Sequence, residues 1–293
     1  HSAGMCMRFV TDSPNIYVRY KLHLERLEMS HMPATGVSGI DLYADNGEGI
    51  DHWVSVIQPN KQVMDTSIAK GLAPGSRRYT VYLPLYNGVD DMEVGVTKGE
   101  SFRPLTPREE KPILFYGTSI MHGACASRPG LAFPAILGRR LRRPTINLGF
   151  SGNGVMEPEV SDLLAEQDPC VFVIDCLPNM NETTVSKRTI PFVKRLRESH
   201  NNTPILLVED RSFTNTLFFP SRKIHHRKSR TALKKVYAEL KDSGVRNLFY
   251  LDGDHLLGDD GEGATDGSHP NDLGMMRYAD AYEPVLRTIL KQY

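Results

Sequence analysis

Residues 113–123 read ILFYGTSIMHG, a strand-length apolar run that leads through a glycine into a polar turn. The run ILFYG is too apolar to have one face in water, which is typical of a parallel strand covered by helices on both sides. Ser119 stands in the turn that follows, directly before a stretch of helical character. A strand, a tight turn and a helix in this order predict an α/β fold that presents Ser119 at the carboxyl edge of its sheet.

The same alternation of short apolar runs and longer amphipathic segments continues to the end of the chain. Four further runs predict parallel strands at 145–150, 170–176, 204–210 and 248–253. The segments around them predict helices at 132–141, 159–167, 182–199, 230–244 and about 273–291. We therefore expect a doubly wound sheet over residues 106–293, with its ligand site at the carboxyl ends of the strands.

Before this domain, the apolar residues recur with period two. Residues 16–22, with the sequence IYVRYKL, show the alternation of a half-buried strand. Similar β-rich runs, separated by turns rich in Gly, Asn, Asp and Pro, lie at 40–45, 53–58, 79–85 and 92–97. They predict an all-β sandwich or jelly roll over residues 1–105, joined to the α/β domain through the polar stretch 98–112.

The composition narrows the range of partners. Thirty-five basic and thirty-five acidic residues give a formal net charge of zero, so no global field draws the chain to nucleic acid or to an anionic membrane. No run approaches the roughly 18 apolar residues that a membrane-spanning helix needs. We expect a small-molecule or oligosaccharide partner. We also expect a secreted or periplasmic protein whose leader is absent from this sequence, which starts at His1.

The four cysteines form no CxxC pair, so we expect free thiols and neither a disulfide framework nor a zinc site. Cys170 and Cys176 bracket the run CVFVIDC, and their separation predicts that both lie on one face of an extended strand, in a core. The acidic stretch 252–263 does not follow the calcium-loop pattern, and the histidines are not at metal-ligand spacing. The sequence therefore predicts no metal site.

Polar residues gather directly after the predicted strands, and two of these positions suggest catalysis. Ser119 follows the first strand near a helix start, where backbone N–H groups favour a developing negative charge. Asp266 stands three residues before His269, so its carboxylate can hold one imidazole nitrogen while the other faces outward. The simpler alternatives are an N-cap at Ser119 and a surface loop at 266–269, with Pro270 at the first position of the last helix.

Glycine and asparagine follow the second and third strands. Gly152 lies in SGNG after the second strand, and Asn179 lies in LPNM after the third. Their amide hydrogens and the backbone amide of Ser119 can converge on a tetrahedral oxyanion. Each residue also has an ordinary structural use, positive φ for glycine and local capping for asparagine. Because the polar sites follow four strands in order, the pattern favours one shared site.

This order of blocks resembles the SGNH (GDSL-type) hydrolase superfamily over about residues 111–293. GTSI approximates its first block, NLGFSGNG its second, DCLPNM its third and DGSH its last. Thr118 stands where the family has Asp before the nucleophile, and LPNM replaces its usual GxND. Upstream, GIDLY at 39–43 resembles the GxDLY domain that precedes some bacterial SGNH hydrolases.

The resemblance implies a flavodoxin-like three-layer α/β/α domain that hydrolyses esters without a metal or cofactor. Ser119 is then the nucleophile, His269 the base and Asp266 the residue that orients it. Ser119, Gly152 and Asn179 are then the oxyanion donors. The implied substrate is a small acyl ester, foremost acetyl, on carbohydrate, and the reaction passes through an acyl-enzyme.

Two other functions stay open at this point. One is acyl transfer to a sugar hydroxyl on the same scaffold, which depends on whether water or a sugar captures the acyl-enzyme. The other is a non-catalytic carbohydrate-binding protein in which the first domain carries the function. The presence of Ser119, Asp266 and His269 argues against a binding protein, because binding does not need all three.

The segment from Asp210 to Arg230 follows the fourth strand and is longer than an ordinary βα loop. It carries Phe213, Phe218 and Phe219 among Arg, Lys and His residues. Two interpretations are open, a lid over the substrate and a solvated basic loop with a few packed aromatic rings.

Overall fold

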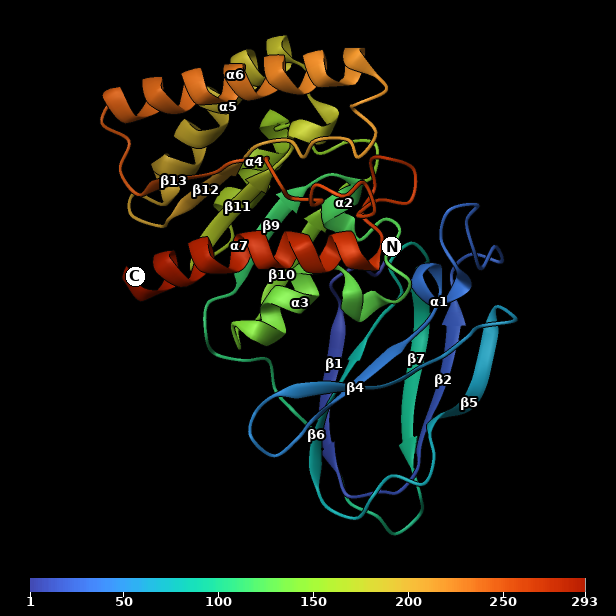
Figure 1. Ribbon diagram of the computed structural model, residues 1–293. Helices are drawn as coiled ribbons and strands as arrows, with labels where there is room; N and C mark the ends of the chain where they lie inside the picture. Colours follow the sequence, from blue (N-terminus) through green and yellow to red (C-terminus); the bar gives the residue numbers. More distant parts are fainter. Residues whose placement is uncertain (293) are drawn as a thin grey trace.

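The computed structural model describes residues 1–292, and their N-terminal third forms two facing antiparallel sheets (Figure 1). The larger sheet has the strand order β4-β3-β6-β1-β8, and the smaller sheet has the order β5-β2-β7. The strands are β1 (Cys6–Thr11), β2 (Ile16–Leu22), β3 (Asp41–Asp45), β4 (Asp51–Val56), β5 (Val63–Ala69), β6 (Arg77–Tyr82), β7 (Val89–Val96) and β8 (Phe102–Pro104). The short helix α1 (Ala34–Val37) precedes β3.

The core of this β domain follows from the alternation along its strands. Every second residue of β2 from Ile16 to Leu22 is buried, while the residues between them are exposed, as the period-two pattern predicts. Apolar residues of both sheets form one cluster, so the β domain is a sandwich. The sequence pattern did not predict β1, β5 or β8. Arg8 and Asp65 interrupt the first two, and β8 is only three residues long.

The rest of the described chain forms an α/β domain around one parallel sheet of order β10-β9-β11-β12-β13. The strands are β9 (Ile113–Gly117), β10 (Thr145–Gly149), β11 (Val171–Asp175), β12 (Ile205–Val208) and β13 (Leu248–Leu251). The helices are α2 (Ser119–His122), α3 (Phe133–Arg140), α4 (Pro158–Ala165), α5 (Glu182–Ser199), α6 (Pro220–Asp242) and α7 (Asp272–Gln292). Two 3₁₀ turns join them, η1 (Pro129–Leu131) and η2 (Leu177–Asn179).

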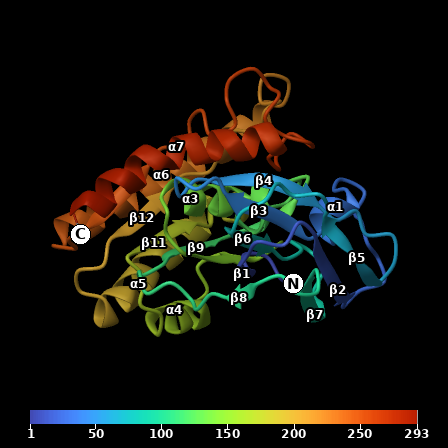
Figure 2. The same ribbon diagram turned by 90° about the horizontal axis from the view of Figure 1, so that it is seen from below.

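Helices cover both faces of the parallel sheet. Ile113 and Phe115 of β9 pack in one core with α3 and α7, and Leu114 and Tyr116 pack in another with α4, α5 and α6. Figure 2 shows β9, β11 and β12 between α7 on one side and α4 and α5 on the other. Both faces of β9 are therefore apolar, which is why its sequence shows no alternation. The three-layer α/β/α architecture confirms the predicted fold class.

The register of the sheet brings the polar segments together. Gly117 at the end of β9 lies level with Gly149 of β10 and Asp175 of β11. The residues that follow these three positions therefore leave the sheet at the same edge, which is the carboxyl edge where α/β proteins bind ligands.

Two expectations about the α/β domain are wrong. Helix α6 begins at Pro220 and not near residue 230, so the segment 210–230 is a short loop followed by about three helical turns. The first half of α6 is dominated by Arg, Lys and His, which favour or tolerate helix but hide the apolar period.

Cys170 and Cys176 lie just beyond the two ends of β11 and pack on opposite faces of the sheet, not on one. Cys176 already has helical backbone angles, so the extended alternation does not reach it. All four cysteines are free thiols, as predicted. Within residues 1–292, no helix is both long enough and apolar enough to cross a membrane.

Candidate active site

Ser119 is the first residue of α2, the helical turn that follows β9. The residue before it, Thr118, is the N-cap, because its backbone is extended and its hydroxyl oxygen accepts from the N–H of Ile120 at 3.3 Å. An aspartate at this position can accept the same bond. Thr118 therefore takes the capping role that was the alternative reading of Ser119, and the Ser119 hydroxyl is left for another partner.

That partner is His269, on the loop before α7. Ser119 Oγ lies 2.9 Å from His269 Nε2, and His269 Nδ1 lies 2.7 Å from Asp266 Oδ2. A carboxylate only accepts, so Nδ1 carries the proton toward Asp266 and Nε2 is left to accept the serine proton. The structure therefore joins Ser119, His269 and Asp266 in one hydrogen-bonded chain, hereafter the triad.

A tight turn holds Asp266 and His269 in place. Asp266 Oδ1 accepts from the backbone N–H of Ser268 at 2.9 Å and from that of His269 at 2.8 Å. Burial raises the pKa of Asp266, but hydrogen bonds from the His269 ring and from these two backbone groups outweigh it and lower the pKa to about 2. Asp266 is thus an anion at neutral pH, and such a carboxylate can stabilise a positive charge on the His269 ring.

A buried ion pair supports this turn. Arg211, which is 2% exposed, donates to the backbone oxygen of Ser268 at 3.3 Å and also to its hydroxyl. Asp210, fully buried, accepts from Arg211 and from His226 Nδ1, the latter at 2.7 Å. Burial raises the pKa of Asp210, but the charge of Arg211 and the bond from His226 lower it further than burial raises it. Sequence reasoning missed this support: a charged pair directly after an apolar strand indicates an ion pair but not its contact with Ser268.

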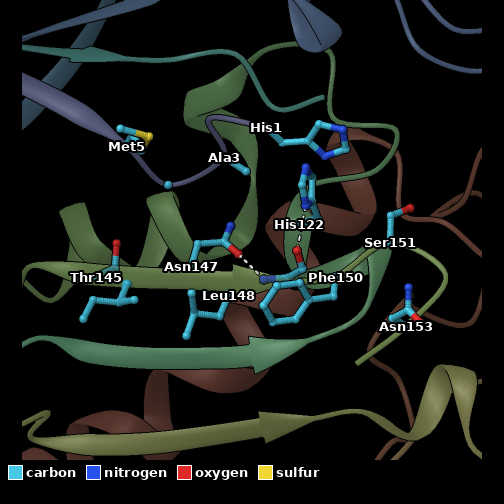
Figure 3. A pocket seen from close by; sticks show the side chains of 13 residues that line it. His1, Ala3, Met5, His122, Thr145, Asn147, Leu148, Phe150, Ser151 and Asn153 are labelled. Carbon is cyan, nitrogen blue, oxygen red and sulfur yellow. Dashed lines mark hydrogen bonds between the residues drawn. The ribbon is translucent and has the colours of Figure 1, made fainter. Parts of the chain in front are cut away.

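Helix α2 is fixed by His122, three residues after Ser119 (Figure 3). His122 Nδ1 lies 2.7 Å from the backbone oxygen of Gly149, and Nε2 lies 2.5 Å from that of Leu85 in the β domain. Burial lowers the pKa of His122, against the two carbonyl oxygens, which favour the protonated ring. These contacts tie the helix of Ser119 both to β10 and to the β domain.

The hollow drawn in Figure 3, of about 630 Å³, lies between β10 and the N-terminal segment. Phe150, Ser151 and Asn153 form part of its wall. None of the triad residues lines it. The hollow therefore adjoins the SGNG loop but does not contain Ser119.

The SGNG loop lies directly against the start of the Ser119 turn. Phe150 donates its N–H to the backbone oxygen of Gly117 at 2.9 Å. A Cβ on Gly154 would stand 2.1 Å from the same oxygen, so close packing requires glycine there. Gly152 has a φ of +74° and open space around its Cβ position. The positive φ therefore explains why residue 152 is a glycine. The N–H of Gly152 lies in a loop that borders the serine turn.

Asn179 lies in η2, at the end of β11, and its side chain reaches the SGNG loop. It donates one amide hydrogen to the backbone oxygen of Asn153 at 2.6 Å. A side-chain amide has two hydrogens, so one is left for a ligand. The structure thus brings the second and third sequence blocks together beside the serine turn.

The GIDLY motif joins the two domains. Asp41, fully buried in β3, accepts from Arg128 Nη1 at 2.9 Å and from the backbone N–H of Gly130 at 2.8 Å. Arg128 also donates to the Tyr43 hydroxyl at 2.6 Å. A Cβ on Gly130 would stand 2.3 Å from the Tyr43 ring. The motif therefore contacts the α/β domain, a role that its sequence did not suggest.

The segment that GIDLY holds also contacts the start of α7, which follows the loop of Asp266 and His269. Ser127 accepts from the Thr35 hydroxyl at 2.6 Å and donates its N–H to Asp272 at 2.8 Å, at the start of α7. The β domain also approaches the triad itself, because the ring centre of His31 lies 6.1 Å from that of His269. Sequence reasoning gave no sign of this contact.

The loop after β12 borders the triad on another side. Thr214 donates its N–H to the backbone oxygen of Gly267 at 3.0 Å. Leu217 and Phe218, at the tip of the loop, are 84% and 76% exposed. The loop is thus placed where a lid could act, and that role stays a prediction.

Two family models match the sequence. The GDSL-like lipase/acylhydrolase family matches residues 110–287. GxDLY, described as "N-terminus of Esterase_SGNH_hydro-type", matches residues 1–102. The comparison with curated proteins gives no match.

Solved structures with a similar fold cover nearly the whole chain. A protein described as a GDSL-like lipase, from Bacteroides ovatus, is 33% identical with a TM-score of 0.94, over 99% of this chain and 85% of its own. A salicylyl-acyltransferase from a tetracycline biosynthetic pathway is 20% identical with a TM-score of 0.77, over 98% and 83%. A family two carbohydrate esterase from Clostridium thermocellum, in complex with cellohexaose, is 14% identical with a TM-score of 0.72, over 99% and 94%. The last two show a shared fold.

Proposed function

The chain belongs to the GDSL-like lipase/acylhydrolase family and is an SGNH-type esterase; from that premise we propose that it hydrolyses small acyl esters, foremost acetyl esters, on carbohydrate. The observation that carries the proposal is the hydrogen-bonded triad, with 2.9 Å from Ser119 to His269 and 2.7 Å from His269 to Asp266. The first distance allows His269 to take the Ser119 proton, and the second allows Asp266 to hold the His269 ring.

In the first half of the proposed reaction, His269 Nε2 takes the Ser119 proton as Oγ attacks the ester carbonyl carbon. The tetrahedral intermediate collapses when His269 returns that proton to the alcohol oxygen, and the C–O bond to the alcohol breaks. Asp266 holds the His269 ring and balances its transient positive charge. The products of this half are the free alcohol and an acyl-Ser119 ester.

In the second half, His269 takes a proton from water, and the hydroxide attacks the acyl carbon. Collapse of the second tetrahedral intermediate gives the carboxylic acid and returns the proton to Ser119. The proposed proton transfers involve only Ser119, His269, water and the departing alcohol. If a sugar hydroxyl takes the place of this water, the same steps give acyl transfer.

The backbone N–H groups of Ser119 and Gly152 and the Asn179 side chain are the proposed oxyanion donors. The contact of Asn179 with the SGNG loop supports this assignment, because it places the second and third blocks on one side of the serine turn. Donors fixed in advance by such contacts stabilise the negative oxygen without reorganising during the reaction.

Carbohydrate as the substrate class has two supports. The fold is shared with a family two carbohydrate esterase that was solved with cellohexaose. The formal net charge of zero gives no preference for a strongly charged substrate. A secreted or periplasmic location fits this substrate class, and finding the natural protein only in the cytoplasmic fraction would contradict that part of the proposal.

The experiment is acetate release from partly acetylated sugars and from 4-nitrophenyl esters of increasing acyl length. We expect turnover with the acetyl esters, a decline with longer acyl chains and, in Ser119→Ala, a loss of about three or more orders of magnitude. Products are separated, so that acetate from hydrolysis is distinguished from newly acylated sugar. A folded wild-type protein with no activity on any ester, or Ser119→Ala with near-normal activity, would overturn the proposal.

A further inference from the structure

We propose that the β domain supplies a binding subsite for the alcohol part of the ester, in which His31 hydrogen-bonds a hydroxyl group of a carbohydrate. This inference rests on the proposed function and adds the place and chemistry of leaving-group recognition. Its starting point is a tight turn that carries His31 to the ring of His269.

The turn is built by two methionines. Met29 and Met32 exchange backbone hydrogen bonds of 3.0 and 3.1 Å, which leaves Ser30 and His31 as the two residues of the tip. Met32 is 2% exposed and, with Met29, packs in the core that the sheet shares with α3 and α7. The turn belongs to the β domain by sequence but is anchored in the α/β domain by packing.

The separation of the two rings decides what His31 can do. Their centres are 6.1 Å apart and their planes are inclined by 43°. A direct hydrogen bond between two imidazole nitrogens brings ring centres to about 5 Å. His31 is therefore too far away to compete with Ser119 or Asp266 for His269, but close enough to share a bound substrate with it.

The direction of ester cleavage decides which part of the substrate lies there. His269 Nε2 gives its proton to the departing alcohol oxygen, so this oxygen must lie next to the His269 ring. The carbonyl oxygen is taken by the donors proposed at Ser119, Gly152 and Asn179. His31, beside the His269 ring, therefore faces the alcohol part and not the acyl part.

The surroundings of the turn indicate the chemistry of that alcohol. An open hollow of about 520 Å³ adjoins the turn. Arg26, Glu28 and Ser30 line it together with Leu27, Met29, Ala34 and Pro59, whereas His31 and the triad residues lie outside its lining. Hydrogen-bond donors and acceptors in an open hollow suit a ring with several hydroxyl groups, since each can exchange a bond to water for a bond to protein. An apolar alcohol gains no such bonds. The class of alcohol that fits is a sugar.

The subsite is held against the triad by the contacts between the domains. Asp41 binds Gly130, and Thr35 binds Ser127, in the segment that leads from α2 to α3. His31 is thus placed by the same contacts that hold the two domains together. A binding group on such a support keeps its geometry without being ordered by the substrate.

The test compares two acetyl esters of primary alcohols, methyl 6-O-acetyl-glucoside and cyclohexylmethyl acetate. Both have a six-membered ring, and only the first has hydroxyl groups. They form the same acetyl-enzyme, so a difference in kcat/KM reports on the alcohol part. We expect His31→Ala to lower kcat/KM about tenfold for the glucoside, the size of one lost hydrogen bond, and less than about twofold for cyclohexylmethyl acetate.

Two further variants complete the test. His31→Gln keeps a hydrogen-bond donor and should recover most of the loss. His52→Ala removes an exposed histidine on β4 and should change neither substrate. Equal losses on both esters, or no loss on the glucoside, would overturn this inference and leave the proposed function standing. No Ser119-dependent hydrolysis of either ester by the wild type would overturn the proposed function and this inference with it.

Discussion

Two carboxylates of this protein make similar hydrogen bonds in opposite surroundings. Asp266 is exposed and accepts from the imidazole and backbone of His269, three residues away, and from the backbone of Ser268. Asp41 is fully buried and accepts from Arg128 and Gly130, which are 87 and 89 residues away in the sequence. The first set of bonds forms within one turn, and the second forms only when two domains meet.

The comparison teaches which carboxylate serves stability and which serves the reaction. Removing one partner of a buried pair leaves an uncompensated charge or donor, which costs about 3–5 kcal/mol. An exposed group that loses its partner forms hydrogen bonds with water instead, so the same change at the surface costs little stability. Substitution of Asp41 should therefore lower mainly the free energy of unfolding, and substitution of Asp266 should lower mainly kcat.

The largest expected effect is that of Asp266→Asn on turnover. The amide can still accept from the backbone, but it no longer holds the His269 proton on Nδ1, so Nε2 is not left free to accept from Ser119. We expect kcat to fall about 10⁴-fold, as loss of the correct tautomer does in such triads. Steady-state kinetics and thermal unfolding on one preparation measure both quantities. A variant with normal kcat but a much lower Tm would reverse the roles that we assign to the two carboxylates.

Asp41→Asn should have the largest effect on stability. One carbonyl oxygen cannot satisfy Arg128, Gly130 and the Trp53 indole, which donates to Asp41 at 2.9 Å. We expect a loss of about 3 kcal/mol or more in the free energy of unfolding, with kcat almost unchanged in the folded fraction. Urea denaturation checks the first quantity.

The matched control for Asp41 is Asp65→Asn, on the same domain. Asp65 pairs with Arg19 at 2.9 Å, and both side chains are more than half exposed. This substitution should cost less than about 1 kcal/mol. If the two variants lose the same stability, the contrast between buried and exposed carboxylates fails.

Asn179→Ala tests whether Asn179 contributes to the reaction, as Asp266 does, or to stability, as Asp41 does. Negative charge on the ester oxygen appears only near the tetrahedral intermediate, so loss of a donor should lower kcat about 100-fold, with little change in KM. Asn181→Ala is the control, since Asn181 caps α5 by accepting from the N–H of Thr184 at 2.9 Å. It should lower stability by about 1 kcal/mol and leave kcat unchanged. Asn179→Ala with the behaviour expected of Asn181→Ala would remove Asn179 from the oxyanion site.

The smallest effect concerns acid stability. The folded-state pKa of Asp266 is lowered from 3.8 to about 2, so its contribution is present above pH about 4 and is lost as the pH falls toward 2. The Tm of the wild type should therefore drop more steeply between pH 4 and 2 than the Tm of Asp266→Asn. Parallel curves for the two proteins would show that the bonds of Asp266 add nothing to stability, even at the surface.

The sequence predicted the features whose signal is local. Four strands of the parallel sheet are almost wholly apolar, and the fifth, β10, carries Thr145 and Asn147 among its apolar residues; each was found within a few residues of its observed bounds. The spacing of Asp266 and His269 predicted their hydrogen bond for the same reason, because both residues lie in one turn. The start of α6 was missed where charged residues mask the apolar period, which is a failure of the same local signal.

Contacts between distant residues could not be predicted in this way. Nothing near Arg211 in the sequence indicates that it donates to Ser268, and nothing near His31 indicates that its ring approaches His269. Asp41 stands in a recognisable motif, but its partners lie in the other domain. The pattern identified the motif without its contacts, because alternation and spacing describe only the residue's own strand or turn.

The sequence by itself determined the class of both domains, the positions of the apolar strands and the residue types that gather after them. Only the tertiary structure decided that Ser119 meets His269, that GIDLY binds the neighbouring domain and that His31 faces the triad. The physical reason is that sequence patterns reflect only local preferences of the chain. Burial and backbone preference act on each segment as it stands, whereas a hydrogen bond between distant residues exists only once packing has brought the two segments together.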